Sequence, residues 1–174
     1  MKRYVIDFFL SGCLAALVLA GNVAGAGSTS SCVQTTGGWS SMQEKKIFLI
    51  NDRGKKIVFL ARIADEPAEL AAGYQYICPD VISHSAILFD FGRQFTSRFH
   101  MRGVFAPLDI AFFDQSGKLV SVTHMTAEPP GFSGQRKLYS AAAPYRYALE
   151  TPAGFLAGHF LTGDTTRLVV ESVH

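Results

Sequence analysis

The chain has 174 residues, of which 48% are hydrophobic and 17% are charged, with a formal net charge of +2. That length is enough for one domain with a hydrophobic core of its own. A charge so close to balance excludes proteins that are drawn to nucleic acid or anionic lipid mainly by their net charge. Binding partners must therefore be sought in local sequence patterns.

The N-terminal segment has the features of a secretory signal peptide. Two basic residues precede an uncharged run over 8–20, which is short for a membrane span, since a span needs ~18 residues or more. A small-residue cleavage site at 24–26 predicts that residues 1–26 are removed and that the protein is exported, with the periplasm as its expected location. Two alternatives are a lipid anchor at Cys13, within Leu-Ser-Gly-Cys, and an uncleaved anchor. The membrane is expected as a partner only through such a segment.

Residues 27–43 are rich in Ser, Thr and Gly, and they predict a flexible linker before a single domain over 44–174. Without the signal segment the chain has 14 basic and 13 acidic residues and two cysteines, Cys32 and Cys78. An oxidising compartment would allow these cysteines to form a disulfide. The alternative is that Cys78 is a free, reactive thiol.

The domain begins with two strand patterns on either side of Asn-Asp-Arg-Gly at 51–54, which predicts a β-hairpin. A short helix is expected over 66–72, because Asp65 and Pro67 suit a helix start and Gly73 suits a helix end. Apolar and alternating patterns then predict more strands, a second short helix near 153–160 and a closing strand. The strands are expected over 85–91, 97–103, 108–113, 118–125 and 145–151.

Many short strands with two brief helices predict a mainly β (α+β) fold, a compact and barrel-like antiparallel or mixed sheet. The segment 127–144 holds three of the seven prolines and predicts a long irregular loop. Phe132 and Tyr139 lie in this loop among basic residues. They could contact a ligand, or they could fold down over the end of the barrel.

Several landmarks, taken in order, resemble the domain of unknown function 192 family over roughly residues 45–172. They include a Glu-x-x-x-Gly run at 69–73, Pro-Leu-Asp-Ile followed by an Asp-x-x-Gly turn, Tyr-x-x-Glu-x-x-x-Gly at 147–154, and a final Gly-Asp. The resemblance implies a small protein, often exported, with a β-barrel-like sheet and small helices, and it implies no established activity. The chain departs from the family pattern at His100, where the family has an aromatic residue, and at Gly103, where it has Asn.

Charged residues interrupt two of the expected strands. Alternation along 97–103 places His100 and Arg102 on one face, and Asp109 follows in the strand over 108–113. If the two strands pair, Arg102 and Asp109 meet at the corner between them, and a buried carboxylate requires such a partner. The candidate ligand-binding residues are therefore His100, Arg102 and Asp109. The alternative is a structural network that only locks the corner.

Three further acids, Glu69, Glu150 and Asp164, are assigned to a structural polar network, with Glu150 as a cap or a salt-bridge partner. No spacing typical of a metal site, a nucleophile elbow or a phosphate loop occurs, so no metal, cofactor or catalytic residue is predicted.

The expected function is that of a non-catalytic module of the bacterial envelope, which binds a small ligand or an envelope protein and no nucleic acid. One alternative is a small hydrolase-like enzyme that uses His100 with Asp109, or Cys78. Another is a structural partner in an envelope complex, for which a flat apolar patch is expected.

Overall fold

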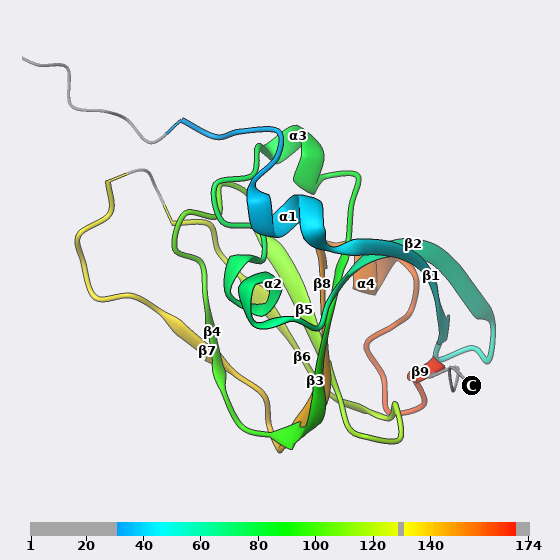
Figure 1. Cartoon of the computed structure of the whole chain (residues 1–174). Helices are drawn as coiled ribbons and strands as arrows, with labels where there is room; N and C mark the ends of the chain where they lie inside the picture. The colour runs from blue at the N-terminus through cyan, green and yellow to red at the C-terminus, as the bar shows by residue number, and fades with distance from the viewer. Residues whose placement is uncertain (1–30, 129–130, 170–174) are drawn as a thin grey trace, which may run out of the picture.

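The computed structural model describes residues 31–128 and 131–169, so the expected signal segment lies outside the described residues. A sheet of seven strands, in the order β6-β5-β8-β3-β2-β1-β9, forms the body, and β4 and β7 form a second sheet beside it (Figure 1). The strands of the two sheets are β1 (Gln43–Ile50), β2 (Lys56–Ala64), β3 (Ile87–Phe95), β4 (Arg98–His100), β5 (Leu108–Phe113), β6 (Leu119–Met125), β7 (Leu138–Ser140), β8 (Tyr145–Pro152) and β9 (Arg167–Val169). The helices are α1 (Gly37–Ser41), α2 (Pro67–Ala72), α3 (Pro79–Ile82) and α4 (Phe155–Gly158), and none in the described ranges is long and apolar enough to cross a membrane.

The local predictions that depend on neighbouring residues are confirmed. Strands β1 and β2 pair antiparallel around a turn in which Gly54 has φ +71°. Helix α2 ends before Gly73, as the sequence predicts, and it starts at Pro67, one residue later than expected, with Glu66 instead of Asp65 as its N-cap. The mainly β class is confirmed as well. The sheet is mixed, because β2 pairs parallel with β3 after the chain passes through α2 and α3.

Both faces of the large sheet are buried at its middle, and β5 shows why. Leu108, Ile110 and Phe112 point into a core that is covered by the segments around α1, α2, α3 and β4. Ala111 and Phe113 point into a second core, which β1, β2, β9 and α4 enclose. All six residues of β5 are buried, including Asp109 on the second face.

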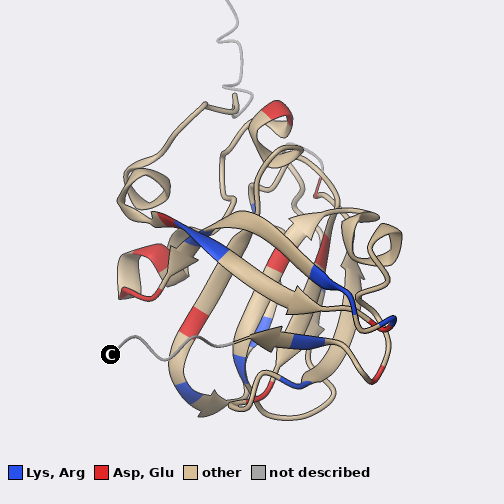
Figure 2. Cartoon of the chain, turned by 90° about the vertical axis from the view of Figure 1, so that its right-hand side faces the viewer, with Lys and Arg blue, Asp and Glu red and all other residues tan. Residues whose placement is uncertain are grey.

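The sheet curls but is not closed into a barrel, which corrects the barrel-like expectation. Strand β9 pairs with β1 at one end of the sheet (Figure 2). The opposite end reaches β9 only through an isolated antiparallel bridge between Lys118 and Arg167. One bridge leaves most of the β6 edge outside any continuous ladder, so the curl encloses the second core without closing the sheet.

The segment that was expected to be a flexible linker packs on the domain from residue 31 onward. A disulfide joins Cys32 to Cys78, and the Val33 N–H donates to the Tyr76 carbonyl at 2.8 Å. Trp39, in α1, is 4% exposed, and its ring lies 5.4 Å from that of Tyr74. A large apolar side chain and a covalent link together hold this Ser- and Gly-rich stretch against the core.

Candidate functional site

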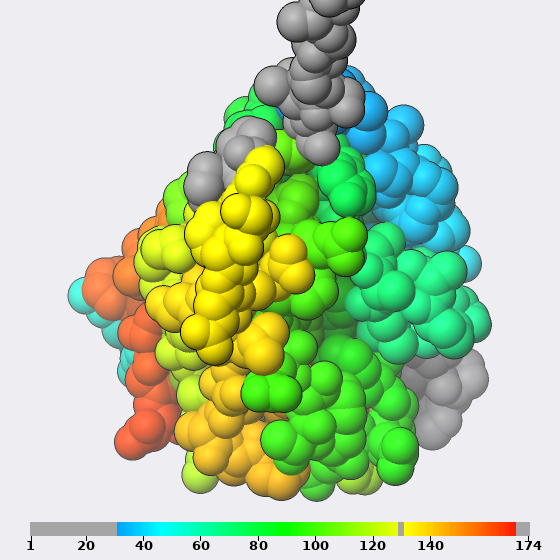
Figure 3. All heavy atoms as spheres, turned by 90° about the vertical axis from the view of Figure 1, so that its left-hand side faces the viewer, coloured from blue at the N-terminus to red at the C-terminus, as the bar shows by residue number. Residues whose placement is uncertain are grey.

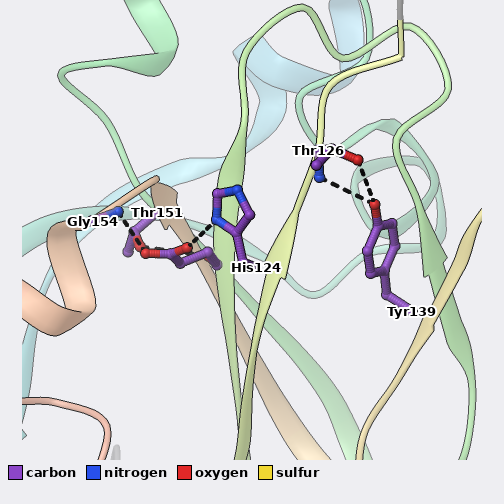
Figure 4. A network of polar contacts seen from close by, with 6 residues as sticks. His124, Thr126, Tyr139, Thr151 and Gly154 are labelled. Carbon is purple, nitrogen blue, oxygen red and sulfur yellow. Dashed lines mark hydrogen bonds and ion pairs between the residues drawn. The ribbon is translucent and has the colours of Figure 1, made fainter.

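The buried carboxylate of Asp109 is fully paired, although not by the predicted partners (Figure 4). Its Oδ1 lies 2.8 Å from Nδ1 of His124, and its Oδ2 accepts a hydrogen bond from the Gly154 N–H at 2.6 Å. Asp109 and His124 are direct partners in the β5–β6 ladder. The carboxylate therefore ties β5 to β6 and to the start of α4.

The structure does not bring His100 and Arg102 to this carboxylate, which corrects the expected Arg102–Asp109 clamp. The physical reason is strand pairing: β5 is flanked by β6 and β8, whereas β4 pairs with β7 in the other sheet. His100 and Arg102 are both exposed, and the Arg102 N–H donates to Nδ1 of His100 at 3.3 Å.

The two aromatic residues of the 127–144 segment, which could either contact a ligand or fold down onto the domain, lie in different environments. Tyr139 is 3% exposed, and its hydroxyl accepts the Thr126 N–H at 3.1 Å (Figure 4). This tyrosine therefore folds down onto the core, whereas Phe132 remains 41% exposed. The register of β4 with β7 places Tyr139 opposite Phe99.

A hollow opens between the α2 segment, β3 and β4, and Figure 3 views the face on which it lies. The cavity has a volume of about 270 Å³. Three phenylalanine rings form much of its wall, and Leu70 and Val104 add to it. The remaining lining is polar and comes partly from β4. The phenylalanines are Phe89, Phe91 and Phe99, and the polar side chains include Gln75, Ser97, Arg98, His100 and Glu150.

Glu150 is the group in this cavity that the sequence interpretation misplaced. It lies within β8, opposite Ile87 on one side and Ile110 on the other, and it is 5% exposed. Within residues 31–128 and 131–169, no hydrogen bond or ion pair reaches its carboxylate, so it is neither the cap nor the salt-bridge partner that was expected. Burial raises the pKa of Glu150 to about 8.

Gly73 lies directly in front of Glu150. A Cβ added at this glycine would lie 3.9 Å from Oε2 of Glu150 and 3.5 Å from the Phe89 ring. The glycine has φ +47° and ψ −137°, a backbone conformation that side chains strongly disfavour. The missing side chain thus leaves room in front of the carboxyl group.

Glu69 explains the other end of the Glu-x-x-x-Gly landmark. Its Oε2 accepts the N–H groups of Asp65 and Glu66, both at 3.3 Å, and so completes a capping box at the start of α2. At the end of α2 the Gly73 N–H donates to the Glu69 carbonyl at 3.2 Å. The landmark therefore sets both ends of the helix that forms one wall of the cavity.

Gly103, where this chain departs from the family pattern, keeps the backbone conformation that an Asn could also adopt. Its φ is +67°, and its carbonyl accepts the Tyr76 N–H at 2.6 Å. Asn and Gly are the residues that adopt this left-handed region most readily. The position therefore requires a backbone conformation, which Gly103 supplies without the amide side chain.

Asp164 does not hold the final Gly-Asp turn together. Its side chain is exposed, and Asp52 performs the expected role from the β1–β2 turn. Oδ2 of Asp52 accepts the Gly163 N–H at 2.8 Å, and Oδ1 accepts the Thr166 hydroxyl at 2.7 Å. Although slight burial opposes it, these hydrogen bonds lower the pKa of Asp52.

The sulfur of Cys78 is bonded to Cys32, so it offers no thiolate to a substrate. In the part of the chain that the structure describes, no group of three or more His, Cys, Asp or Glu side chains is placed to hold a metal ion. Sequence reasoning named Glu150 but gave it the wrong role, that of a cap or a salt-bridge partner. A signal for its burial was present, since Glu150 directly follows the apolar run Tyr147–Leu149.

Two solved structures share the fold. A protein from Sinorhizobium meliloti, described as a candidate transcription regulator, has a TM-score of 0.63 and 23% identity, covering 74% of this chain and 95% of its own. A protein of unknown function from Novosphingobium aromaticivorans has a TM-score of 0.64 and 19% identity, covering 83% of this chain and 98% of its own. At such identities the likeness carries the fold and no function. No curated protein matches the chain.

The family model described as "Uncharacterized ACR", DUF192, matches residues 48–168, which include α2, Asp109 and Glu150. This chain therefore belongs to the domain of unknown function 192 family.

Proposed function

We propose that this protein is a non-catalytic, small-ligand-binding module of the bacterial envelope, and that its ligand occupies the cavity in front of Glu150. The observation that carries the proposal is the carboxyl group of Glu150, a residue only 5% exposed, which faces a cavity and has no hydrogen-bond or ion-pair partner among the described residues. A bound ligand would supply the missing hydrogen bonds, and burial of this kind is typical of functional sites.

Binding is favoured over catalysis by what surrounds the carboxyl group. An enzyme that uses covalent catalysis needs a nucleophile hydrogen-bonded to a base, and a third group that orients the base. Ser97 and His100 line the cavity, yet neither makes a hydrogen bond to a carboxylate among the described residues. Asp109 does hold the His124 ring by a hydrogen bond. That pair, however, lies on the face of β5 that points away from the cavity, where it joins β5 to β6 and α4.

Export to the periplasm is part of the same proposal. The cleavage site at 24–26 supports it, and so does the disulfide between Cys32 and Cys78, because such bonds persist in oxidising compartments. An exported module with a small open cavity could deliver its ligand to an envelope protein or sense the ligand there.

A thermal-shift screen of small metabolites against the purified protein tests the binding function. A compound present at about 100 times its Kd stabilises a protein by about 2.7 kcal/mol, which is a shift of several degrees in Tm for a domain of this size. We expect a hit whose shift disappears in Glu150→Gln and persists in Glu44→Gln, a control on the exposed part of β1. Hits that shift both variants alike, or no hits at all, would overturn the proposal.

A further inference from the structure

The inner end of the cavity suits a positively charged group. Glu150 supplies the only acidic side chain among the described lining residues, and the walls are aromatic. The rings of Phe89 and Phe99 meet edge to face at 5.4 Å, and those of Phe89 and Phe91 are stacked at 6.3 Å. A carboxylate beside aromatic faces attracts an ammonium group both by charge and by cation–π interaction.

The mouth of the cavity has the opposite sign. Arg98 and His100 lie there on β4, and both are exposed. Within the described ranges the Arg98 guanidinium belongs to no ion pair, so it is free to bind an anionic group on a ligand. A simple cation would be repelled at this mouth, whereas a molecule with an anion at its outer end would be attracted.

The size of the cavity restricts the ligand further. A volume of about 270 Å³ lies at or below the small end of the usual range for ligand pockets. Phe91, Phe99 and Leu70 are half-buried apolar lining residues, intermediate in exposure between the buried acid and the exposed guanidinium. An ω-amino acid with a short hydrocarbon chain has this size, carries both charges and places the apolar chain between them.

We infer that the ligand is a small zwitterion of the ω-amino-acid class, with its ammonium group against Glu150 and its carboxylate at Arg98. This inference rests on the proposed function, since it names the ligand class of the same cavity. Gly73 is what admits the ammonium group, because a side chain there would begin within 4 Å of the carboxyl oxygen.

The dependence of affinity on pH separates this ligand class from its rivals. An ammonium group needs the ionised form of Glu150, whose pKa burial raises to about 8. Affinity should therefore rise about fivefold between pH 7 and pH 8, with release of close to one proton per ligand at pH 7. A carboxylate held by protonated Glu150 would bind more weakly over this interval, and a neutral sugar would show no trend.

The other titratable groups at the cavity do not mimic this trend. They are Tyr74, Arg98 and His100. Burial raises the pKa of Tyr74 above its usual value of 10, and arginine stays charged throughout. Glu150→Gln keeps all three of these groups, so the part of the trend that this variant loses belongs to Glu150.

The experiment is calorimetry of the protein with a series of unbranched ω-amino acids, from β-alanine to 6-aminohexanoate, followed by two relatives of the best binder. One relative is its decarboxylated amine, and the other is its N-acetyl derivative. We expect each relative to bind at least tenfold more weakly, Glu150→Gln to lose at least tenfold in affinity, and Arg98→Ala to lose severalfold. The matched control is Arg93→Ala, an exposed arginine of β3 outside the cavity, which should bind as the parent does.

Equal binding of the N-acetyl derivative, or an affinity that falls between pH 7 and pH 8, would overturn the inference. If no ω-amino acid binds but another metabolite does so in a Glu150-dependent way, the ligand class is wrong and the proposed function stands. If nothing binds in a Glu150-dependent way, both fail.

Discussion

Gly73 and Glu150, which are far apart in the sequence, face each other so closely that a Cβ on the glycine would lie 3.9 Å from the carboxyl oxygen Oε2. The capping of α2 fixes the position of Gly73, and the pairing of β8 with β3 and β5 fixes the position of Glu150. Helix geometry and strand register together therefore decide whether the cavity is open.

Replacing Gly73 tests this relationship. Gly73→Ala should lower the free energy of unfolding by about 1–3 kcal/mol, because an alanine cannot adopt φ +47° with ψ −137° without strain. The measurement is urea unfolding followed by circular dichroism. The control is Gly37→Ala, where an added Cβ meets nothing within 4 Å and α1 gains a better helix former. Equal effects of the two substitutions would show that the backbone at residue 73 is unstrained.

Asp109 should matter more for stability than its partner. Asp109→Asn should lower the free energy of unfolding by about 1–3 kcal/mol, because an amide cannot accept from both Gly154 and His124 as the carboxylate does. His124→Asn should cost less than about 1 kcal/mol, since the side chain of His124 is 55% exposed. Comparing the two unfolding midpoints in urea checks this order, and the reverse order would contradict a buried carboxylate anchored mainly by the main chain.

The stability of the protein should depend on pH through Glu150. The pKa of Glu150 is about 8 in the folded state and near its model-peptide value of about 4.3 when unfolded, so between these values the folded state binds the extra proton. Stability should therefore fall as pH rises from about 4.5 to 8, by a few kcal/mol, and level off above 8.

Glu150→Gln removes this titration and leaves the other groups in place. The variant should gain stability relative to the parent across the same interval, as measured by urea unfolding at pH 5, 6, 7 and 8. A constant difference between variant and parent would mean that the folded state keeps the carboxylate ionised.

Breaking the disulfide should release the N-terminal segment. For a loop of this length the chain-entropy model gives about 4 kcal/mol, and we expect about 2–4 kcal/mol from Cys32→Ser with Cys78→Ser. Trp39 lies in the segment that follows Cys32. In the double variant its fluorescence should therefore shift towards that of an exposed tryptophan on mild heating, before the sheet unfolds. A thiol assay that finds two free cysteines in the native parent protein would show that the bond does not form.

Cleavage of the N-terminal segment should decide where in the cell the protein is found. Expressed in a bacterial host, the protein should appear in the periplasmic fraction with Gly27 as its first residue, as read by mass spectrometry. A protein retained in the membrane fraction with its first residue at Cys13 would instead establish the lipid anchor.

The local sequence was sufficient for the elements whose contacts are near neighbours. The Asn-Asp-Arg-Gly turn predicted the β1–β2 hairpin, and Pro67 with Gly73 bounded α2, because turn and cap chemistry act over only a few residues. Alternation along 97–103 placed His100 and Arg102 on one face, and both are exposed, whereas Met101 between them is buried.

Only the tertiary structure decided which strands are neighbours. That β4 pairs with β7 instead of β5, and that β3 pairs parallel with β2, depends on contacts between residues that the sequence does not place side by side. The same contacts pair Asp109 with His124 and leave Arg102 exposed to solvent. They also bury Glu150 between two apolar strands beside Gly73, because the environment of a side chain in a sheet is set by the strands that flank it.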